Sequence, residues 1–179
     1  MNIKSRLAAA ADLRTSEYWE GMTFLDPKYD GAIIGVAESC PGREAKVMYD
    51  KKRLAKISTD RWGPKLNPAV YVLDPVDRGK TITKRRIHNM ALKWDGGIIT
   101  ADDLEKAFVG LAQVSPRRAL AVYDRERVLK RLADTFEPVD EDDDVETMAI
   151  EWYEYNTIGS WVGEKTPVFM IYLEDMTLD

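Results

Sequence analysis

The sequence of 179 residues contains a single cysteine, Cys40, and a single histidine, His88. One cysteine excludes an internal disulfide, so the fold does not depend on an oxidising compartment. One thiol and one imidazole leave few ways to assemble a zinc site or a catalytic triad, and no local motif supports a Cys40–His88 nucleophile pair. We therefore expect no metal, no cofactor and no catalytic residue, and we favour a non-enzymatic role.

Long apolar runs are also missing from the sequence. No uncharged stretch approaches the ~20 residues that a membrane-spanning helix requires. Near the N-terminus, Asp12, Arg14 and Glu17 interrupt any segment that could serve as a secretory signal. With 45% hydrophobic and 32% charged residues, the composition is typical of a globular protein. We expect a soluble cytoplasmic protein without a membrane partner.

Two motifs that bind phosphate or calcium are matched only in part. The string RGKT ends at Thr81, but Asp74 stands where a phosphate loop needs its first glycine, so we reject a nucleotide site. Acidic residues also occupy positions 1, 3, 5 and 12 of a calcium-binding loop: Asp140, Asp142, Asp144 and Glu151. The sixth position should be glycine and is Val145, which favours an exposed acidic loop before a helix.

The most informative feature is an internal repeat. Residues 32–57 and 107–132 align with one single-residue gap. The identical pairs include Ala32 and Ala107, Gly35 and Gly110, Ala37 and Ala112, Pro41 and Pro116, Arg43 and Arg118, Tyr49 and Tyr123, Asp50 and Asp124, and Arg53 and Arg127. Two copies indicate a duplication, because a solenoid needs three or more units.

Each copy has the residue pattern of strand, turn, strand and helix. β-Branched runs precede and follow a turn that contains proline, and Asp50 and Asp124 stand where a helix N-cap is expected. The similar segments 68–74 and 167–175 predict a third strand in each unit. We also expect a short N-terminal helix, and a helix capped by Thr100 or Asp102.

These units predict an α+β fold: a pseudo-dimer of strand-strand-helix(-strand) units with mainly antiparallel sheet and helices on one face. We expect one domain over residues 1–179. Its parts are an N-terminal helical segment (1–30), repeat one (31–75), a basic connector (76–99) and repeat two (100–179).

The net charge of −5 is unevenly distributed along the chain. Residues 42–93 carry 14 basic and 5 acidic side chains, whereas residues 94–179 carry 8 basic and 20 acidic ones. Cations and one tryptophan in the connector could contact nucleic acid: Arg78, Lys80, Lys84, Arg85, Arg86, Lys93 and Trp94. In the second half, the candidate partner-binding residues are Asp140, Asp142, Asp143, Asp144, Trp152 and Trp161. Alternatively, the basic and acidic regions lie side by side and neutralise each other.

An aromatic-rich motif follows the acidic run. Its residues are Glu154, Tyr155 and Asn156, then Gly159, Ser160, Trp161 and Gly163, then Thr166, Pro167, Val168 and Phe169. This pattern resembles a motif of small uncharacterised bacteriophage proteins, and the similarity extends to residues 121–132. The resemblance implies no activity or cofactor. Turn chemistry also accounts for the motif, with Asn156 predicted to end a helix in the left-handed region and Thr166–Pro167 to start a strand.

From these features we expect a phage-type accessory protein that binds a host or viral macromolecule, and it could inhibit a host defence. A protein partner is favoured. Nucleic-acid binding through residues 78–93 is the first alternative, and a small-ligand binder or enzyme with a pocket between the repeats is the second. A homo-oligomer and a virion component also stay open.

Overall fold

The computed structural model describes residues 3–15, 22–38, 44–58, 70–76, 82–95, 97–138, 144–160 and 162–176. The strands are β1 Ile33–Glu38, β2 Lys46–Asp50, β3 Tyr71–Pro75, β4 Phe108–Ser115, β5 Arg118–Asp124 and β6 Val168–Tyr172. The α-helices are α1 Ile3–Thr15, α2 Lys51–Ile57, α3 Lys84–Ala91, α4 Arg125–Ala133 and α5 Val145–Trp152. Three further helical turns are the 3-10 segments η2 Pro27–Ala32 and η3 Glu105–Ala107 and the π-helical segment η4 Tyr153–Ile158.

The strands form a closed barrel in chain order, from β1 to β6 and back to β1. Four of the pairings are antiparallel: β1 with β2, β3 with β4, β4 with β5, and β6 with β1. The pairs β2–β3 and β5–β6 are parallel, and each needs a crossover connection, which contains α2 in the first case and α4 and α5 in the second. The α+β class and the mainly antiparallel sheet are therefore confirmed.

The strand registers of the first half recur in the second half. In both hairpins the register shifts at the same place, between Ile33 and Gly35 in β1 and between Phe108 and Gly110 in β4. The parallel pair β2–β3 has the same register as β5–β6, residue for residue. The antiparallel pair β1–β6 likewise has the same register as β4–β3. The corresponding segments are 33–38 and 108–113, 46–50 and 120–124, and 71–75 and 168–172.

Two glycines permit the close approach of neighbouring strands at these register shifts. A Cβ atom on Gly35 would lie 2.0 Å from the carbonyl oxygen of Ile171, and one on Gly110 would lie 2.4 Å from that of Asp74. Gly110 also has a φ of +149°, which side chains other than glycine rarely adopt. The two positions that sequence comparison pairs therefore have the same steric requirement.

Buried side chains form three clusters, one inside the barrel and two outside it. The interior cluster contains residues from all six strands, including Met48, Leu73, Leu120 and Met170. One outer cluster joins β1 and β2 to α1, η2 and α2, and the other joins β4, β5 and Phe169 to α3, α4 and η4. Strands have two buried sides here, which explains why their sequences read as nearly continuous apolar runs.

A tyrosine in each half fixes the segment that leads into that half. The Tyr49 hydroxyl accepts a hydrogen bond from the Leu25 amide at 3.0 Å, and the Tyr123 hydroxyl accepts one from the Ala101 amide at 2.9 Å. Both tyrosines are fully buried. These bonds satisfy backbone donors that would otherwise lie at least partly shielded from water.

The predicted N-caps are confirmed at the start of α2 and α4. Asp50 accepts a hydrogen bond from the Arg53 amide at 2.8 Å, and Asp124 accepts one from the Arg127 amide at 3.3 Å. Asp124 is buried and also pairs with the Arg127 guanidinium at 3.2 Å. In both helices an aspartate side chain thus caps the first turn by accepting a backbone amide hydrogen bond.

Two local expectations were wrong, and one helix was not predicted. No α-helix starts at Thr100 or Asp102; the chain forms only the short η3, whose N-cap residue Leu104 makes no side-chain bond. The basic connector instead contains α3, which Thr83 caps. Asn156 lies inside η4 and does not adopt the left-handed conformation, because the helix continues for two further residues.

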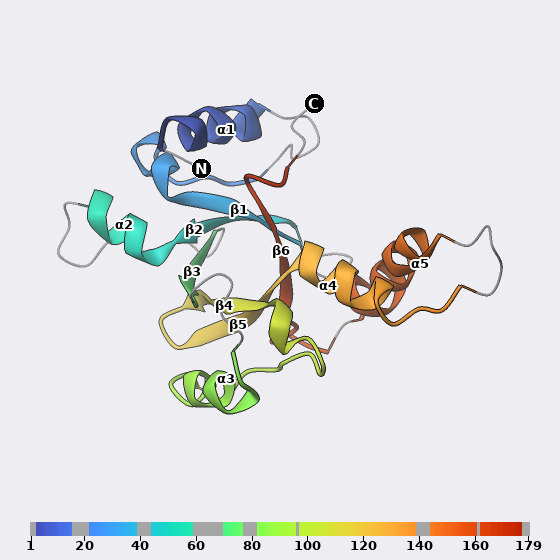
Figure 1. The fold of residues 1–179 in the computed structure, drawn as a ribbon. Coiled ribbons are helices and arrows are strands. Elements are labelled where there is room, and N and C mark those ends of the chain that lie inside the picture. The colour runs from blue at the N-terminus through green and yellow to red at the C-terminus, as the bar shows by residue number, and fades with distance from the viewer. Residues whose placement is uncertain are drawn as a thin grey trace.

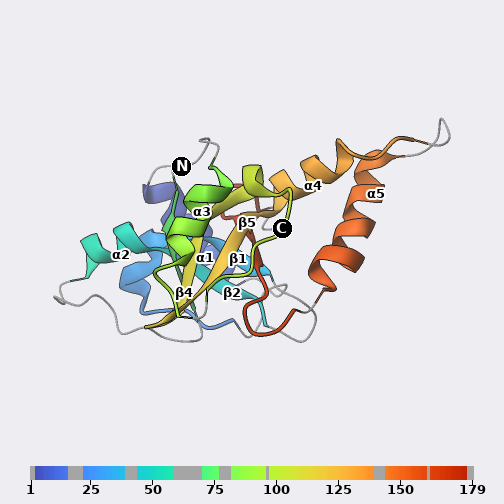
Figure 2. The same ribbon diagram turned by 90° about the horizontal axis from the view of Figure 1, so that it is seen from below.

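The helices lie outside the barrel at several positions (Figure 1). We expected them on one face of a sheet, but a closed sheet has only an inner and an outer surface. α1 lies on one side of the barrel and α3 on the opposite side, while α4 and α5 lie side by side and extend away from it (Figures 1 and 2). None of the described helices is long and apolar enough to cross a membrane.

Candidate functional site

The predicted basic surface is only partly available for binding. Arg78 and Lys80 lie outside the described residues. Lys84, Arg85, Arg86 and Lys93 are exposed on α3 or just after it. Lys84 forms an ion pair with Glu105 at 3.0 Å, and this bond raises the pKa of the Lys84 ammonium. Trp94 is half-buried and packs against the outer cluster around β4 and β5, so its ring is not free to stack on a base.

The predicted acidic surface lies mostly outside the described residues, which exclude Asp140, Asp142, Asp143 and Trp161. Asp144 is the N-cap of α5. Its carboxylate accepts hydrogen bonds from the Glu146 amide at 3.0 Å and the Thr147 hydroxyl at 2.7 Å, and these bonds lower its pKa. Asp144 therefore has a structural role in starting the helix.

Basic and acidic regions do not neutralise each other in the described part of the chain. The ion pairs of the α3 region are local, from Lys84 to Glu105 and from Asp95 to Arg117. The N-terminal end of α5, which Asp144 caps, lies apart from α3 in both views (Figures 1 and 2). The described parts of the two regions are thus separate surfaces.

A cleft of about 440 Å³ opens beside the α4–α5 pair. Its walls come from the loop at 99–104, the end of α4, the helix from Trp152 to Thr157, and the segment that enters β6. The lining is mainly apolar: Ile99, Leu104, Leu132, Trp152, Val162, Pro167 and Phe169. Asp102, Asp103 and Arg131 add charge. This combination of an apolar lining with a few polar groups is typical of binding sites.

Residues of the aromatic-rich motif form one side of this cleft. Asn156, Ser160, Thr166, Pro167 and Phe169 all line it. The buried Thr166 hydroxyl donates to the Gly163 carbonyl at 2.6 Å and accepts from the Val162 amide at 3.0 Å. These bonds close a tight turn that directs the chain into β6, as the Thr166–Pro167 pair predicts.

Four large apolar side chains among the described residues between 150 and 162 are exposed, and two of them, Trp152 and Val162, line the cleft. The exposed fractions are 40% for Ile150, 42% for Trp152, 83% for Tyr155 and 54% for Val162. Exposed apolar groups beside a cleft mark interaction surfaces more often than isolated ones do. Trp152 belongs both to this exposed group and to the cleft lining, so it links the two features.

The chain around this surface is strongly acidic. Residues 132–163 contain ten acidic side chains and no lysine or arginine. In the described part of this stretch, the exposed carboxylates are Asp134, Glu137, Asp144, Glu146, Glu151 and Glu154. Apart from Arg131 in the cleft wall and the neighbouring Lys130, the surface therefore presents apolar groups within a negative field.

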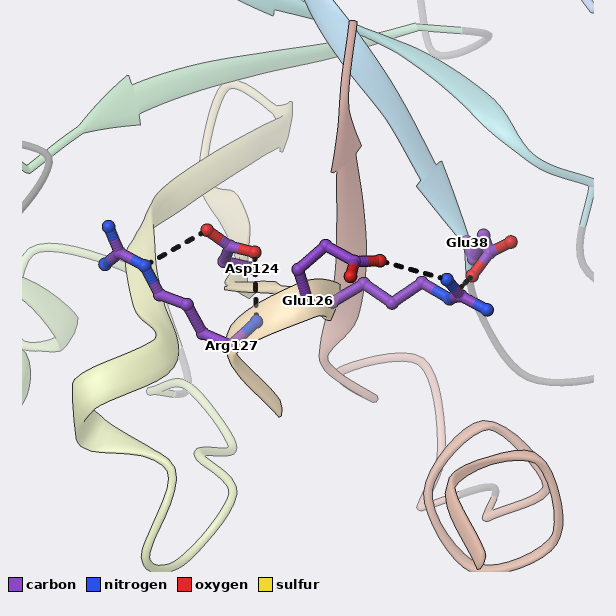
Figure 3. A network of polar contacts seen from close by, with 5 residues as sticks. Glu38, Asp124, Glu126 and Arg127 are labelled. Atoms are coloured by element: carbon purple, nitrogen blue, oxygen red, sulfur yellow. Dashed lines mark hydrogen bonds and ion pairs between the residues drawn. The ribbon is translucent and has the colours of Figure 1, made fainter. Parts of the chain in front are cut away.

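A polar cluster joins the helical pair to the barrel (Figure 3). The Arg125 guanidinium lies 3.4 Å from Glu38 of β1 and 3.2 Å from Glu126, and it lies over the Tyr153 ring at 5.6 Å from the centroid. Burial raises the pKa of Glu38, and the Arg125 charge opposes this effect. Tyr153 is buried and packs edge-on against Phe169. The start of η4 is thus held firmly against β6.

The remaining predicted groups do not converge. His88 is exposed on α3, and Cys40 lies outside the described residues. Within the described ranges, no three His, Cys, Asp or Glu side chains are grouped closely enough to hold a metal ion.

Sequence reasoning identified Trp152 and the motif but missed the opposite wall of the cleft. Ile99, Leu104, Arg131 and Leu132 come from two other segments, and no local pattern marks them as a site.

Comparisons with protein-family models, with curated proteins and with solved structures found no match for this chain.

Proposed function

We propose that this chain is a non-enzymatic accessory protein of the bacteriophage type, and that it binds a partner protein through the α4–α5 side. The observation that carries this proposal is the apolar cleft that the exposed Trp152 and Val162 line, on a helical segment that also exposes Ile150 and Tyr155. Aromatic anchors beside a desolvated pocket are where binding energy concentrates in protein interfaces. An effect on a host defence would follow from the identity of the partner.

The partner's chemistry follows from the charge around the cleft. We expect a partner protein with a basic surface, because ten carboxylates and no cation lie in residues 132–163. One protruding apolar side chain of that partner would fill the cleft. Such charges accelerate encounter and exclude acidic competitors, while the apolar anchor provides the affinity. We expect association to slow as salt concentration rises.

We further propose that the barrel is a pseudo-dimer produced by internal duplication. The matching registers, the paired glycines, the paired tyrosines and the paired aspartate caps support it. The halves differ in their crossovers: residues 51–70 separate β2 from β3, whereas residues 125–167 separate β5 from β6. The longer crossover carries the α4–α5 pair, so the second copy has acquired the binding surface.

Site-specific photo-crosslinking in the cells that carry the gene tests the proposed partner surface. A photoreactive phenylalanine analogue at Tyr155 should capture one predominant protein, and the same analogue at Lys56, an exposed residue of α2, should not. Combining Trp152→Ala with the analogue at Tyr155 should abolish the product. Equal capture from positions 155 and 56 would contradict the proposal.

Nucleic-acid binding through α3 is the second candidate, supported by the exposed Arg85, Arg86 and Lys93. It is weaker because Lys84 is paired and Trp94 is packed. It predicts salt-sensitive binding of single-stranded nucleic acid that decreases when Arg85 and Arg86 are changed to Gln. Binding that these changes leave intact would remove it.

A further inference from the structure

A second concavity, of about 360 Å³, lies at the end of the barrel where β1 begins and β2, β3 and β6 end. Both halves line it, and α1 adds Arg6. Figure 1 shows the C-terminal end of β6 rising toward α1 at this end of the barrel. The concavity is separate from the cleft beside α4 and α5, and the two share no lining residue.

The lining combines an apolar floor with a cluster of cations. Ile34, Leu73 and Tyr172 form the floor and belong to the packing inside the barrel. The cations are Arg6, Lys52 and Arg53, and the carboxylates are Asp50 and Glu174. Three cations and two carboxylates leave an excess of one positive charge. Asp50 is already occupied as the N-cap that accepts the Arg53 amide.

The placement of Arg6 is unfavourable without an added anion, because the Asp50 carboxylate offsets burial and the Arg53 charge only in part. Arg6 Nε is buried and has no hydrogen-bond acceptor within the described ranges. Burial, and then the charge of Arg53, lower the pKa of Arg6, whereas the charge of Asp50 raises it. A buried guanidinium donor without an acceptor is destabilising, and so is the approach of two like charges. An anionic group would relieve both effects.

The corresponding region of the second half has only one of these cations, Arg127, which matches Arg53. Glu126 occupies the position that matches Lys52, and α1 has no counterpart because it precedes the repeated units. The cationic cluster therefore does not follow from the barrel architecture. It depends on Arg6 and Lys52, which are particular to the first half.

We propose that this concavity binds a small organic anion, with a phosphate or carboxylate head between Arg6 and Arg53 and an apolar body against Ile34, Leu73 and Tyr172. Arginine suits this task because its planar group donates paired hydrogen bonds to such heads. The apolar floor adds affinity for a ligand that carries a ring or an alkyl chain.

Three probes distinguish the head group and the body: phenyl phosphate, benzoate and inorganic phosphate. The Nε–Hε signals of Arg6 and Arg53 in a nitrogen-15 NMR spectrum of the full chain report contact directly. We expect phenyl phosphate or benzoate to shift both signals in a saturable manner. Inorganic phosphate should bind about tenfold more weakly than phenyl phosphate, since it leaves the floor uncovered. Equal affinity of these two would overturn the role of the apolar floor.

Variants with a matched control complete the test. Arg53→Gln and Lys52→Glu should each weaken phenyl phosphate binding by roughly tenfold or more, because each removes a charge-assisted contact. Lys56→Gln removes an equally charged, exposed residue from the same helix and should change affinity less than about twofold. No saturable shift at Arg6 and Arg53 with phenyl phosphate or benzoate, or equal loss in the Lys56 variant, would overturn the proposal.

Discussion

At the scale of single residues, the paired glycines have a demanding steric role. Gly110→Ala should destabilise the fold by about 2–4 kcal/mol, because the new methyl group meets the Asp74 carbonyl and the φ of +149° is strained. Gly35→Ala should have a comparable effect through Ile171. Urea unfolding measures both. As a control, Gly97→Asn should change stability by less than ~1 kcal/mol, because nothing lies within 4 Å and Asn tolerates a φ of +72°.

The paired tyrosines provide a second test at this scale. Tyr123→Phe and Tyr49→Phe each remove the acceptor of a backbone amide, so each should reduce stability by about 1–3 kcal/mol. The amides of Ala101 and Leu25 should also exchange with solvent faster. Burial raises the pKa of Tyr123 to about 12, so its phenol should resist titration when exposed phenols ionise. Tyr155→Phe, at an exposed position, is the control and should be neutral.

Glu38 should make stability depend on pH. Burial raises its pKa in the folded state, so the folded protein binds this proton more tightly than the unfolded chain does. Its contribution is therefore complete below the unfolded pKa of about 4.3 and is lost as pH rises through the higher folded pKa. From pH 4 to 7, the free energy of unfolding should decrease more in the wild type than in Glu38→Gln.

Urea unfolding at several pH values measures this difference for Glu38. Glu151→Gln, which changes an exposed carboxylate on α5, serves as the control and should follow the wild type. Parallel pH profiles of the wild type and Glu38→Gln would refute the role assigned to burial.

At the scale of elements, the aspartate caps of α2 and α4 share one bond but differ in environment. Asp50→Ala should reduce stability by about 1 kcal/mol, a usual value for an N-cap. Asp124→Ala should reduce it further, by about 2–3 kcal/mol, because it also leaves Arg127 without its 3.2 Å partner next to a buried site. Thermal unfolding measures both variants. Equal losses would show that the additional ion pair contributes nothing.

Local patterns in the sequence predicted these elements well. The β-branched runs, the aspartate caps and the proline before β6 are short-range signals, and the strands and helices of both units lie where these signals place them. α3 was missed because lysine and arginine at residues 84–86 indicate charge more clearly than helicity. The helix expected after Thr100 failed because the chain there bends so that Ala101 bonds Tyr123.

Barrel closure and the cleft could not be predicted in this way. Closure depends on the pairing of β6 with β1, which lie more than 130 residues apart, and the cleft depends on how the loop at 99–104 meets α4 and η4. Neither contact leaves a periodic pattern in the sequence. The sequence indicated both Trp152 and Asp144 as candidate partner-binding residues. The structure shows that Trp152 lines the cleft, whereas Asp144 caps α5.

At the scale of the whole molecule, the unlike additions to the two halves define separate surfaces. The α4–α5 pair projects from the barrel on one side (Figure 2). Its exposed groups include the carboxylates and apolar side chains of residues 144–155 and two cations at the end of α4, Lys130 and Arg131. The cationic concavity lies at the barrel end where α1 meets both halves. A barrel whose strand registers recur, but whose connecting segments differ, can present two chemically different sites without changing its core.

The most direct test of the proposed function is the affinity for the captured partner, measured by calorimetry with purified proteins. Trp152→Ala should weaken binding by about 30-fold or more, the usual effect of losing an aromatic anchor. Leu92→Ala, which removes a 70% exposed apolar side chain next to α3, should leave the affinity unchanged. A Trp152 variant that binds like the wild type, or an equal loss in the Leu92 variant, would contradict binding through the α4–α5 side.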